Sequence, residues 1–557
     1  MYNRIQLIFL FLFVELSLSA QDMSHFRENR SSVHGSLSAT GTYYHAAGMQ
    51  ARRSPLTGIL AGNFTVNLKG FEMPFAFTYS DQNRSFRQPF NQFGLSPRYK
   101  WLTVHLGYRN INFSKYVLGG HTVFGAGAEL NPGKFRFGFM YGRLNKSTNQ
   151  AVNILRPTTD TLMDFNRKMM SMKIGFGTQK SYFDINLLRA YDDSLTGHGD
   201  YDLHDVFPAA NLVGGVHTRL QLGSHLFFEG EGAYSIYTDN QNSLLEPEGI
   251  PATVQKIIPI NASSSGKLAV EGRLMYQNAK AFRLGVTYRR IAPGYRSMGT
   301  YFLNNDVENM TLNGGFRMLK KKMQLSGSIG LERNNLQLSR NATTHKTIGS
   351  VNLNYNPSAK FGITATYSNY SINQQPGRIQ IADSVKLYQT NGTLMISPHL
   401  FLNSRNKKIR HFISWVFTQM QLTDKNPDSQ YNNSFSTLNN IFSYTLGLVP
   451  SGLNFLVSLN QNHVTMQSGE STNAGATLGI NKRFRKPKVS LGLSATYTHS
   501  TSEQRDLNTL TPVFNATIRL GKHHQFRMNA HMIRSHTTQT ALTTTEQIGM
   551  LRYVFSF

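Results

Sequence analysis

Apolar and polar residues alternate with a period of two along most of the sequence after about residue 35. In 134–144, every second position from Phe135 to Tyr141 is aromatic, and 281–289 and 513–520 repeat the alternation. This period belongs to β-strands, because successive side chains of a strand point to opposite faces of a sheet. No comparably long stretch has the period of an amphipathic helix. The chain is therefore predicted to be all-β.

The lengths of the strands and of their connections narrow this class. The alternating runs are roughly 9–14 residues long, which is the length a tilted strand needs to cross a bilayer. Short connections such as 131–133 and 319–322 alternate with long ones such as 145–167, 239–264 and 292–309. Transmembrane antiparallel barrels have tight periplasmic turns and long external loops. We therefore predict a single outer-membrane β-barrel.

Composition excludes several other classes of protein. The chain has no cysteine, which rules out disulfide scaffolds, cysteine-based zinc sites, iron–sulfur clusters and thiol nucleophiles. A mean hydropathy of −0.33, without a helix-spanning apolar run after the N-terminus, rules out a bundle of transmembrane helices. Charged residues make up only 16 % of the chain and aromatic residues 11 %, which is unusual for a soluble protein of this size.

The first 20 residues have the three parts of a secretory signal peptide. Arg4 supplies the positive charge, 5–14 is almost purely apolar, and small residues precede the expected cleavage after Ala20. Residues 21–35 are expected to form a short periplasmic segment and 36–557 the barrel. So short a segment leaves no room for a plug domain or for the periplasmic repeats of assembly-machinery barrels.

The sequence ends on an aromatic strand. Leu551, Tyr553, Phe555 and Phe557 are spaced by two, and Phe557 is the last residue. This pattern resembles the C-terminal targeting signature of Gram-negative outer-membrane barrels, which the barrel-assembly machinery reads. The resemblance implies localisation in the outer membrane and implies that machinery as a partner.

The strand number should be even, because both ends of the barrel lie in the periplasm, yet the alternating runs number about 25. A short strand hidden between Arg109 and Gly119 would give a total of about 26, whereas one N-terminal segment folded into the lumen would give about 24. The connection 82–97, which contains several Arg and Phe residues, is the candidate for an in-lumen loop. We favour the larger number, and either number gives a wide lumen.

The formal net charge is +27, from 57 Lys plus Arg and 30 Asp plus Glu. Most acidic residues fall in the expected external loops, whereas the expected periplasmic turns 320–322, 405–410 and 482–488 are basic. Basic turns suit the phosphates of a nearby leaflet, or they dock a periplasmic partner. Outer-membrane lipid and lipopolysaccharide are expected partners. Nucleic acid is not expected, despite a pI near 10.0, because the chain is exported.

Several arginines occupy strand positions opposite the lipid-facing apolar residues. We expect them to line the lumen, because an arginine on the lipid face near mid-bilayer costs about 2–4 kcal/mol. These residues are Arg136, Arg219, Arg273, Arg283, Arg289, Arg317, Arg519, Arg527 and Arg552. Either they pair with lumenal acids and set an anion-favouring field, or they form a surface for an anionic cargo such as a glycan, a polyanion or an acidic polypeptide.

No arrangement of residues indicates catalysis, a metal or a cofactor. One expected external loop holds a cluster of five candidate ligands: His198, Asp200, Asp202, His204 and Asp205. These residues lack a full calcium-loop pattern. The glycines at 125 and 127 precede no helix, and no Gly-x-Ser-x-Gly motif is present. We predict that the protein is not an enzyme and binds neither metal nor cofactor.

The signal ending Ser19-Ala20-Gln21, the aromatic-rich hairpins and the stretches 96–146 and 295–313 resemble uncharacterised outer-membrane β-barrel proteins of Bacteroidota. The likeness covers most of the mature chain as a style of barrel. It implies no catalytic or binding residues.

Two functions fit these features. A pore or transport conduit for anionic or polymeric cargo predicts a continuous water path lined by the arginines. A structural, anchoring or assembly barrel for a surface protein or polysaccharide, with a periplasmic or secreted protein partner, predicts a lumen closed by 82–97, 145–167 and 239–264. We favour transport.

Overall fold

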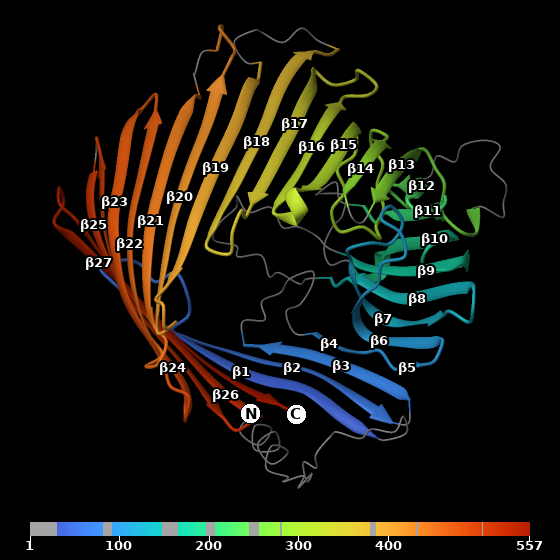
Figure 1. The fold of residues 1–557 in the computed structure, drawn as a ribbon. Helices are drawn as coiled ribbons and strands as arrows, with labels where there is room; N and C mark the ends of the chain where they lie inside the picture. Colours follow the sequence, from blue (N-terminus) through green and yellow to red (C-terminus); the bar gives the residue numbers. More distant parts are fainter. Residues whose placement is uncertain are drawn as a thin grey trace.

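The computed structural model forms one closed antiparallel β-barrel (Figure 1). It describes residues 31–68, 70–81, 92–147, 165–196, 207–243, 255–278, 281–378, 386–429, 433–503 and 505–557. The expected signal peptide, residues 82–91 and the candidate ligands from His198 to Asp205 lie outside these residues. Within them the named helical elements are η1 (Ser194–Thr196) and η3 (Leu319–Lys321), and no helix is long and apolar enough to cross a membrane.

The strands follow one another around the barrel in chain order. They are β1 (Ser32–Ala47), β2 (Leu56–Leu68), β3 (Phe71–Ser80), β4 (Gln92–Leu95), β5 (Arg98–Tyr99), β6 (Leu102–Asn110), β7 (Thr122–Leu130), β8 (Phe135–Asn145), β9 (Asn166–Gly177), β10 (Tyr182–Asp193), β11 (Ala210–Gln221), β12 (Leu226–Thr238), β13 (Ser264–Asn278), β14 (Phe282–Ile291), β15 (Val307–Met318), β16 (Met323–Asn334), β17 (Ala342–Tyr355), β18 (Phe361–Pro376), β19 (Tyr388–Asn403), β20 (Ile409–Asp424), β21 (Phe435–Leu448), β22 (Leu453–Met466), β23 (Gly469–Arg483), β24 (Lys488–Ser502), β25 (Arg505–Leu520), β26 (His524–Thr537) and β27 (Leu542–Ser556).

The barrel closes where β1 pairs with β27, so both ends of the described chain lie side by side (Figure 1). The backbone N–H of Gly35 donates to the carbonyl of Phe557 (2.8 Å), and the N–H of Phe557 donates to the carbonyl of Gly35 (3.1 Å). The ring of Phe557 lies 6.2 Å from the ring of Phe64 and 5.5 Å from that of Phe555. The aromatic terminal strand therefore forms the closing seam.

The wall has an even number of strand positions, as expected. β4 and β5 both pair with β3 and with β6, so the 27 strands of the described chain fill 26 positions. Pro97 interrupts this shared position, because proline has no N–H to give to a ladder. The prediction of 26 is thus correct, but the missing strand is Gln92–Tyr99. It does not lie between Arg109 and Gly119.

The segment that folds into the barrel also differs from the prediction. Residues 92–95, which we had placed in an in-lumen loop, belong to the wall as β4. The in-lumen segment is instead 111–121, where Tyr116, Val117 and Leu118 have 0 % exposure. Residues 292–306, which we had expected in an external loop, pack against it. The barrel also begins at Ser32, four positions earlier than expected.

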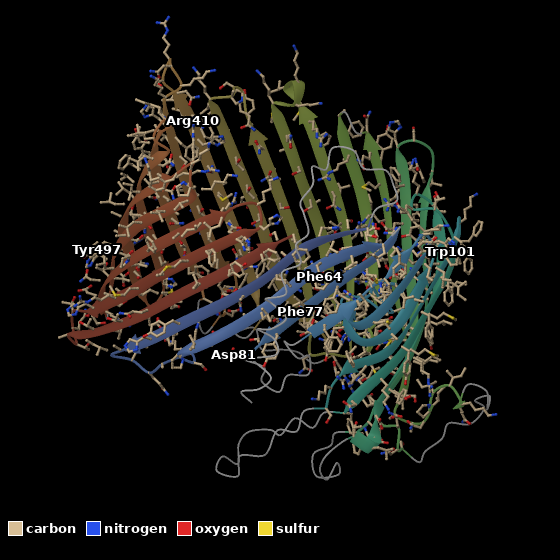
Figure 2. The ribbon with its side chains drawn as sticks, turned by 90° about the horizontal axis from the view of Figure 1, so that it is seen from below. Phe64, Phe77, Asp81, Trp101, Arg410 and Tyr497 are labelled. Carbon is tan, nitrogen blue, oxygen red and sulfur yellow. The ribbon has the colours of Figure 1, made fainter. Side chains whose placement is uncertain are left out.

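The outer face carries the apolar half of the alternation. On β10, Phe183, Ile185 and Leu187 are exposed, whereas the intervening Asp184 and Asn186 are buried. Tyr497 of β24 likewise lies at the outer surface (Figure 2). Hydrocarbon stabilises such an apolar face, and a closed barrel leaves no unpaired strand edge in it. The protein is therefore an outer-membrane β-barrel.

The connections differ between the two ends of the barrel. The end that holds both chain ends has short turns, such as those at 319–322, 449–452 and 521–523, and we call it the short-turn end. Longer connections such as 292–306 and 335–341 start from the other end. The predicted alternation holds over most of the barrel, but the connections of the other end after β22, β24 and β26 are short as well.

We expect deletion of Phe557 to lower the fraction of chain that folds into a closed barrel, because it removes both backbone hydrogen bonds to Gly35. The variant Phe557→Ala keeps these bonds, loses only the ring contacts, and should fold better than the deletion. Heat-modifiable migration in denaturing gels measures the folded fraction. Equal folding of the deletion and the full chain would contradict the role of this seam.

Candidate functional site in the barrel interior

The strand registers define an inner face, and all the predicted arginines lie on it. Directly opposed residues of neighbouring strands share a face, and no change of face occurs from Arg136 to Arg552 along the paired strands. Their positions are Arg136 on β8, Arg219 on β11, Arg273 on β13, Arg283 and Arg289 on β14, Arg317 on β15, Arg519 on β25, Arg527 on β26 and Arg552 on β27.

Over β7–β16 several of the inner cations pair with carboxylates. The Nε and Nη2 atoms of Arg136 donate to the two carboxylate oxygens of Asp184 at 2.7 and 2.8 Å. Such a bidentate pair is strong and fixes the geometry of both side chains. Three further pairs are Lys173–Glu129 (3.4 Å), His217–Glu229 (3.3 Å) and Arg289–Glu332 (3.6 Å). This part of the wall therefore carries little net charge.

The first in-lumen segment, 111–121, also neutralises acidic residues of the wall. Glu231 and Glu271 lie directly opposite each other on β12 and β13, an unfavourable placement for like charges. The hydroxyl of Ser114 donates to Glu231, and Lys115 forms an ion pair with Glu271. The hydroxyl of Tyr116 also donates to Glu271 (2.9 Å), and burial raises the pKa of this phenol, so it stays protonated as a donor.

The second in-lumen segment, 292–306, holds the first against the wall. The hydroxyl of Tyr295 donates to the carbonyl of Tyr116 (2.9 Å), and the hydroxyl of Ser297 donates to that of Val117 (2.8 Å). A Cβ atom on Gly299 would lie 2.3 Å from the carbonyl oxygen of Val117, so the close approach of the two segments requires glycine there. Together the two segments cover the inner face of β8–β14 with a packed apolar cluster.

A cavity of about 1350 Å³ lies on the other side of the interior, at the short-turn end of β19–β26. Among the described residues, no carboxylate lines this cavity, which we call the basic cavity. Its cationic lining residues are Lys407, Arg410, Arg483, Arg485, Lys488, Arg519 and Arg527. None of them forms an ion pair within the described part of the chain. Arg410 lies near the end of its strand (Figure 2).

Two pairs of cations lie directly opposite each other across neighbouring strands, and all of their members except Arg552 line the basic cavity. Lys488 faces Arg519 between β24 and β25, and Arg527 faces Arg552 between β26 and β27. Like charges in such positions destabilise a sheet. The local concentration of positive charge is therefore a cost to the fold at this place.

Among the described residues, no three His, Cys, Asp or Glu side chains are grouped to hold a metal ion. The adjacent His523 and His524 make local contacts: His523 Nδ1 lies 2.6 Å from the carbonyl of Ser556, and His524 Nδ1 lies 2.7 Å from the hydroxyl of Tyr553.

Sequence reasoning missed both in-lumen segments and the basic cavity. Tyr116-Val117-Leu118 is an apolar run inside a long connection, which is a usable signal for a buried loop. The cavity residues come from strand ends and turns more than 100 positions apart, from Lys407 to Arg527, so only the strand order brings them together.

No protein-family model and no curated protein matches the chain. Among solved structures, the chain is similar to the P pilus usher (PapC) translocation pore, with a TM-score of 0.35, 10 % identity, and coverage of 94 % of this chain and 99 % of that one. The FrpB iron transporter from Neisseria meningitidis matches with a TM-score of 0.34 and 11 % identity, over 94 % of this chain and 82 % of that one. Acinetobacter baumannii OccAB2 matches with a TM-score of 0.30 and 9 % identity, over 67 % of this chain and 97 % of that one. Such low scores carry no argument about function.

We expect the variant Leu118→Cys to react slowly with a membrane-impermeant thiol reagent, because this side chain is fully buried. The natural chain has no cysteine, so the background is zero. Adding Gly299→Ala should speed the labelling by about tenfold or more, because the added Cβ separates the two in-lumen segments.

The exposed Phe302, changed to Cys, is the positive control for this labelling. If Leu118→Cys reacted as fast as Phe302→Cys, the two segments would not be packed against the wall.

Proposed function

We propose that this outer-membrane barrel is a non-enzymatic transport conduit whose basic lumen favours anionic or polymeric cargo. One observation carries the proposal: within the described residues, the inner cations at the short-turn end of β20–β27 form no ion pair with a carboxylate, whereas Arg136, Lys173 and Arg289 on β8–β14 each do. Unpaired charges of one sign inside a low-dielectric wall create a focused field that attracts the opposite charge.

The width and lining of the barrel support passage of a hydrated cargo. A closed barrel of 26 positions is wider than the 16–18-stranded porins, which already leave an aqueous channel. Between β21 and β24 the inner wall includes small hydroxyl side chains, with Ser443 bonded to Ser458 (2.8 Å) and Thr477 to Thr496 (2.9 Å). Such side chains present hydrogen-bonding groups to water or to a polar solute.

Other expectations from the sequence remain part of the proposal. We infer that Leu551, Tyr553, Phe555 and Phe557 serve as the signal to the barrel-assembly machinery, since they belong to the strand that closes the ring. Outer-membrane lipid and lipopolysaccharide are the proposed surroundings of the exposed aromatic residues.

We expect steady, anion-selective openings from the purified barrel in a planar bilayer. Changing Arg519 and Arg552 to Gln should lower the anion-to-cation permeability ratio by about half or more, because it removes two unpaired positive charges from the inner wall. Changing Lys320 and Lys321 to Gln removes the same charge from a turn at the same end and should have little effect. Cation-selective openings would contradict the basic lumen, and a silent barrel would favour anchoring over transport.

We expect replacement of 114–119 by a glycine–serine linker to increase the single-channel conductance, because it removes the packed core of the first in-lumen segment. The point variant Tyr116→Phe, which loses only the hydroxyl contact with Glu271, is the matched control and should change the conductance less. An unchanged conductance with the linker would show that the in-lumen segments do not narrow the path.

A further inference from the structure

We propose that the basic cavity is a binding site for an acidic polysaccharide. This inference rests on the proposed function and deepens it, because it names the class of cargo and the place where the cargo is held. It concerns the wall between β19 and β26 at the short-turn end, opposite the two in-lumen segments.

The spread of the cations requires a ligand with several separate anionic groups. They extend from Arg410 on β20 to Arg527 on β26, which are six strand positions apart. Neighbouring strands lie about 4.8 Å apart, so the cations cover about 29 Å of wall. A single phosphate or carboxylate contacts only one or two of these side chains at a time. A polymer with a negative group on successive units can contact them all.

The opposed cation pairs indicate that the charge is kept for a ligand. Lys488 facing Arg519 and Arg527 facing Arg552 weaken the sheet, and no carboxylate of the cavity offsets this cost. A bound anionic group between the two members of a pair would remove the repulsion and form charge-assisted hydrogen bonds with both. The guanidinium fork matches the planar oxygens of a carboxylate particularly well.

The neutral lining favours a sugar chain over an acidic polypeptide. Amide and hydroxyl side chains stand between the cations: Asn403, Asn454, Asn481, Ser490, Thr517 and Gln525. Polysaccharides carry hydroxyl groups along their whole length, and these side chains can both donate to and accept from hydroxyls.

Phe401 and Phe412, whose ring centres are 4.6 Å apart, add an apolar surface to the cavity on which the C–H face of a sugar ring can pack. A polypeptide commonly binds by adding a strand to a free sheet edge, and this closed ring offers none there.

Binding of a fluorescently labelled oligogalacturonate to the full-length barrel in detergent tests the proposal. We expect saturable binding that weakens with salt, and weaker binding by neutral dextran and by poly-glutamate of similar length. The triple variant Arg483→Gln, Arg519→Gln, Arg527→Gln should raise the Kd by about 100-fold. The matched triple variant Lys320→Gln, Lys321→Gln, Lys322→Gln loses the same charge at the same end, outside the cavity, and should change the Kd less than about threefold.

Equal weakening by the two triple variants would overturn the proposal, since binding would then depend on overall charge. Tighter binding of poly-glutamate than of oligogalacturonate would overturn it in favour of an acidic polypeptide. Absence of saturable binding by any probe would overturn it as well.

A stability measurement separates ligand binding from a structural role of the same arginines. Because Arg527 faces Arg552, the single variant Arg527→Gln should unfold at the same or a higher denaturant concentration while binding oligogalacturonate more weakly. A loss of stability together with unchanged binding would mean that Arg527 supports the fold, and would contradict the proposal.

This assay does not depend on conduction. If the barrel binds oligogalacturonate but shows no conductance in a bilayer, the proposed binding site is supported and the proposed transport function is contradicted. If the barrel conducts anions but binds no oligogalacturonate, the proposed transport function is supported and the proposed binding site is contradicted.

Discussion

The backbone pairing of the first strand with the last is the interaction on which the rest of this structure depends. A sheet of this length left open would present two rows of unpaired N–H and C=O groups to hydrocarbon, where no water can satisfy them. Pairing β1 with β27 removes both edges at once. It also creates an inside, because only a closed ring separates one face of each strand from the lipid. The lumen, its charges and its packed segments all follow from that seam.

Charge is distributed unevenly over the inner wall of the barrel. The difference lies between two groups of neighbouring strands, β8–β16 and β19–β26. Across β8–β16 both acids and bases face inward and several of them pair, most closely Arg136 with Asp184. The two in-lumen segments lie over part of this neutral wall, since a packed apolar cluster is stable only where the charges beneath it are compensated. The opposite wall is polar and basic around the cavity of β19–β26.

Much of the fold could be predicted from the sequence, because the alternation of apolar and polar residues is a local property. It identified nearly all of the wall and the inward face of each predicted arginine. It failed at 92–99 and at 111–121, where the pattern is weak. There Pro97 splits one wall position into two short strands, and the apolar run at Tyr116 belongs to a segment that is buried without being a strand.

The candidate site was less predictable, because it depends on contacts between distant parts of the chain. The sequence indicates that Arg519 and Arg527 face inward, but not that Arg483 and Arg410 stand beside them. That neighbourhood is a product of strand order and register. In the same way, nothing local in 292–306 indicates that Tyr295 bonds to Tyr116, nearly 180 positions earlier.

The divided strand position between β3 and β6 has a mechanical consequence for the ring. Most neighbouring strands share a continuous ladder, whereas β4 and β6 are paired only at Gly94 and Leu95, and β5 and β6 only at Arg98 and Tyr99. Pro74 and Pro97 remove further donors from this stretch. The barrel wall is therefore easiest to bend at this strand position. When lateral pressure in the membrane ovalises the barrel, the curvature change will concentrate at this position and leave the geometry of the opposite wall nearly constant.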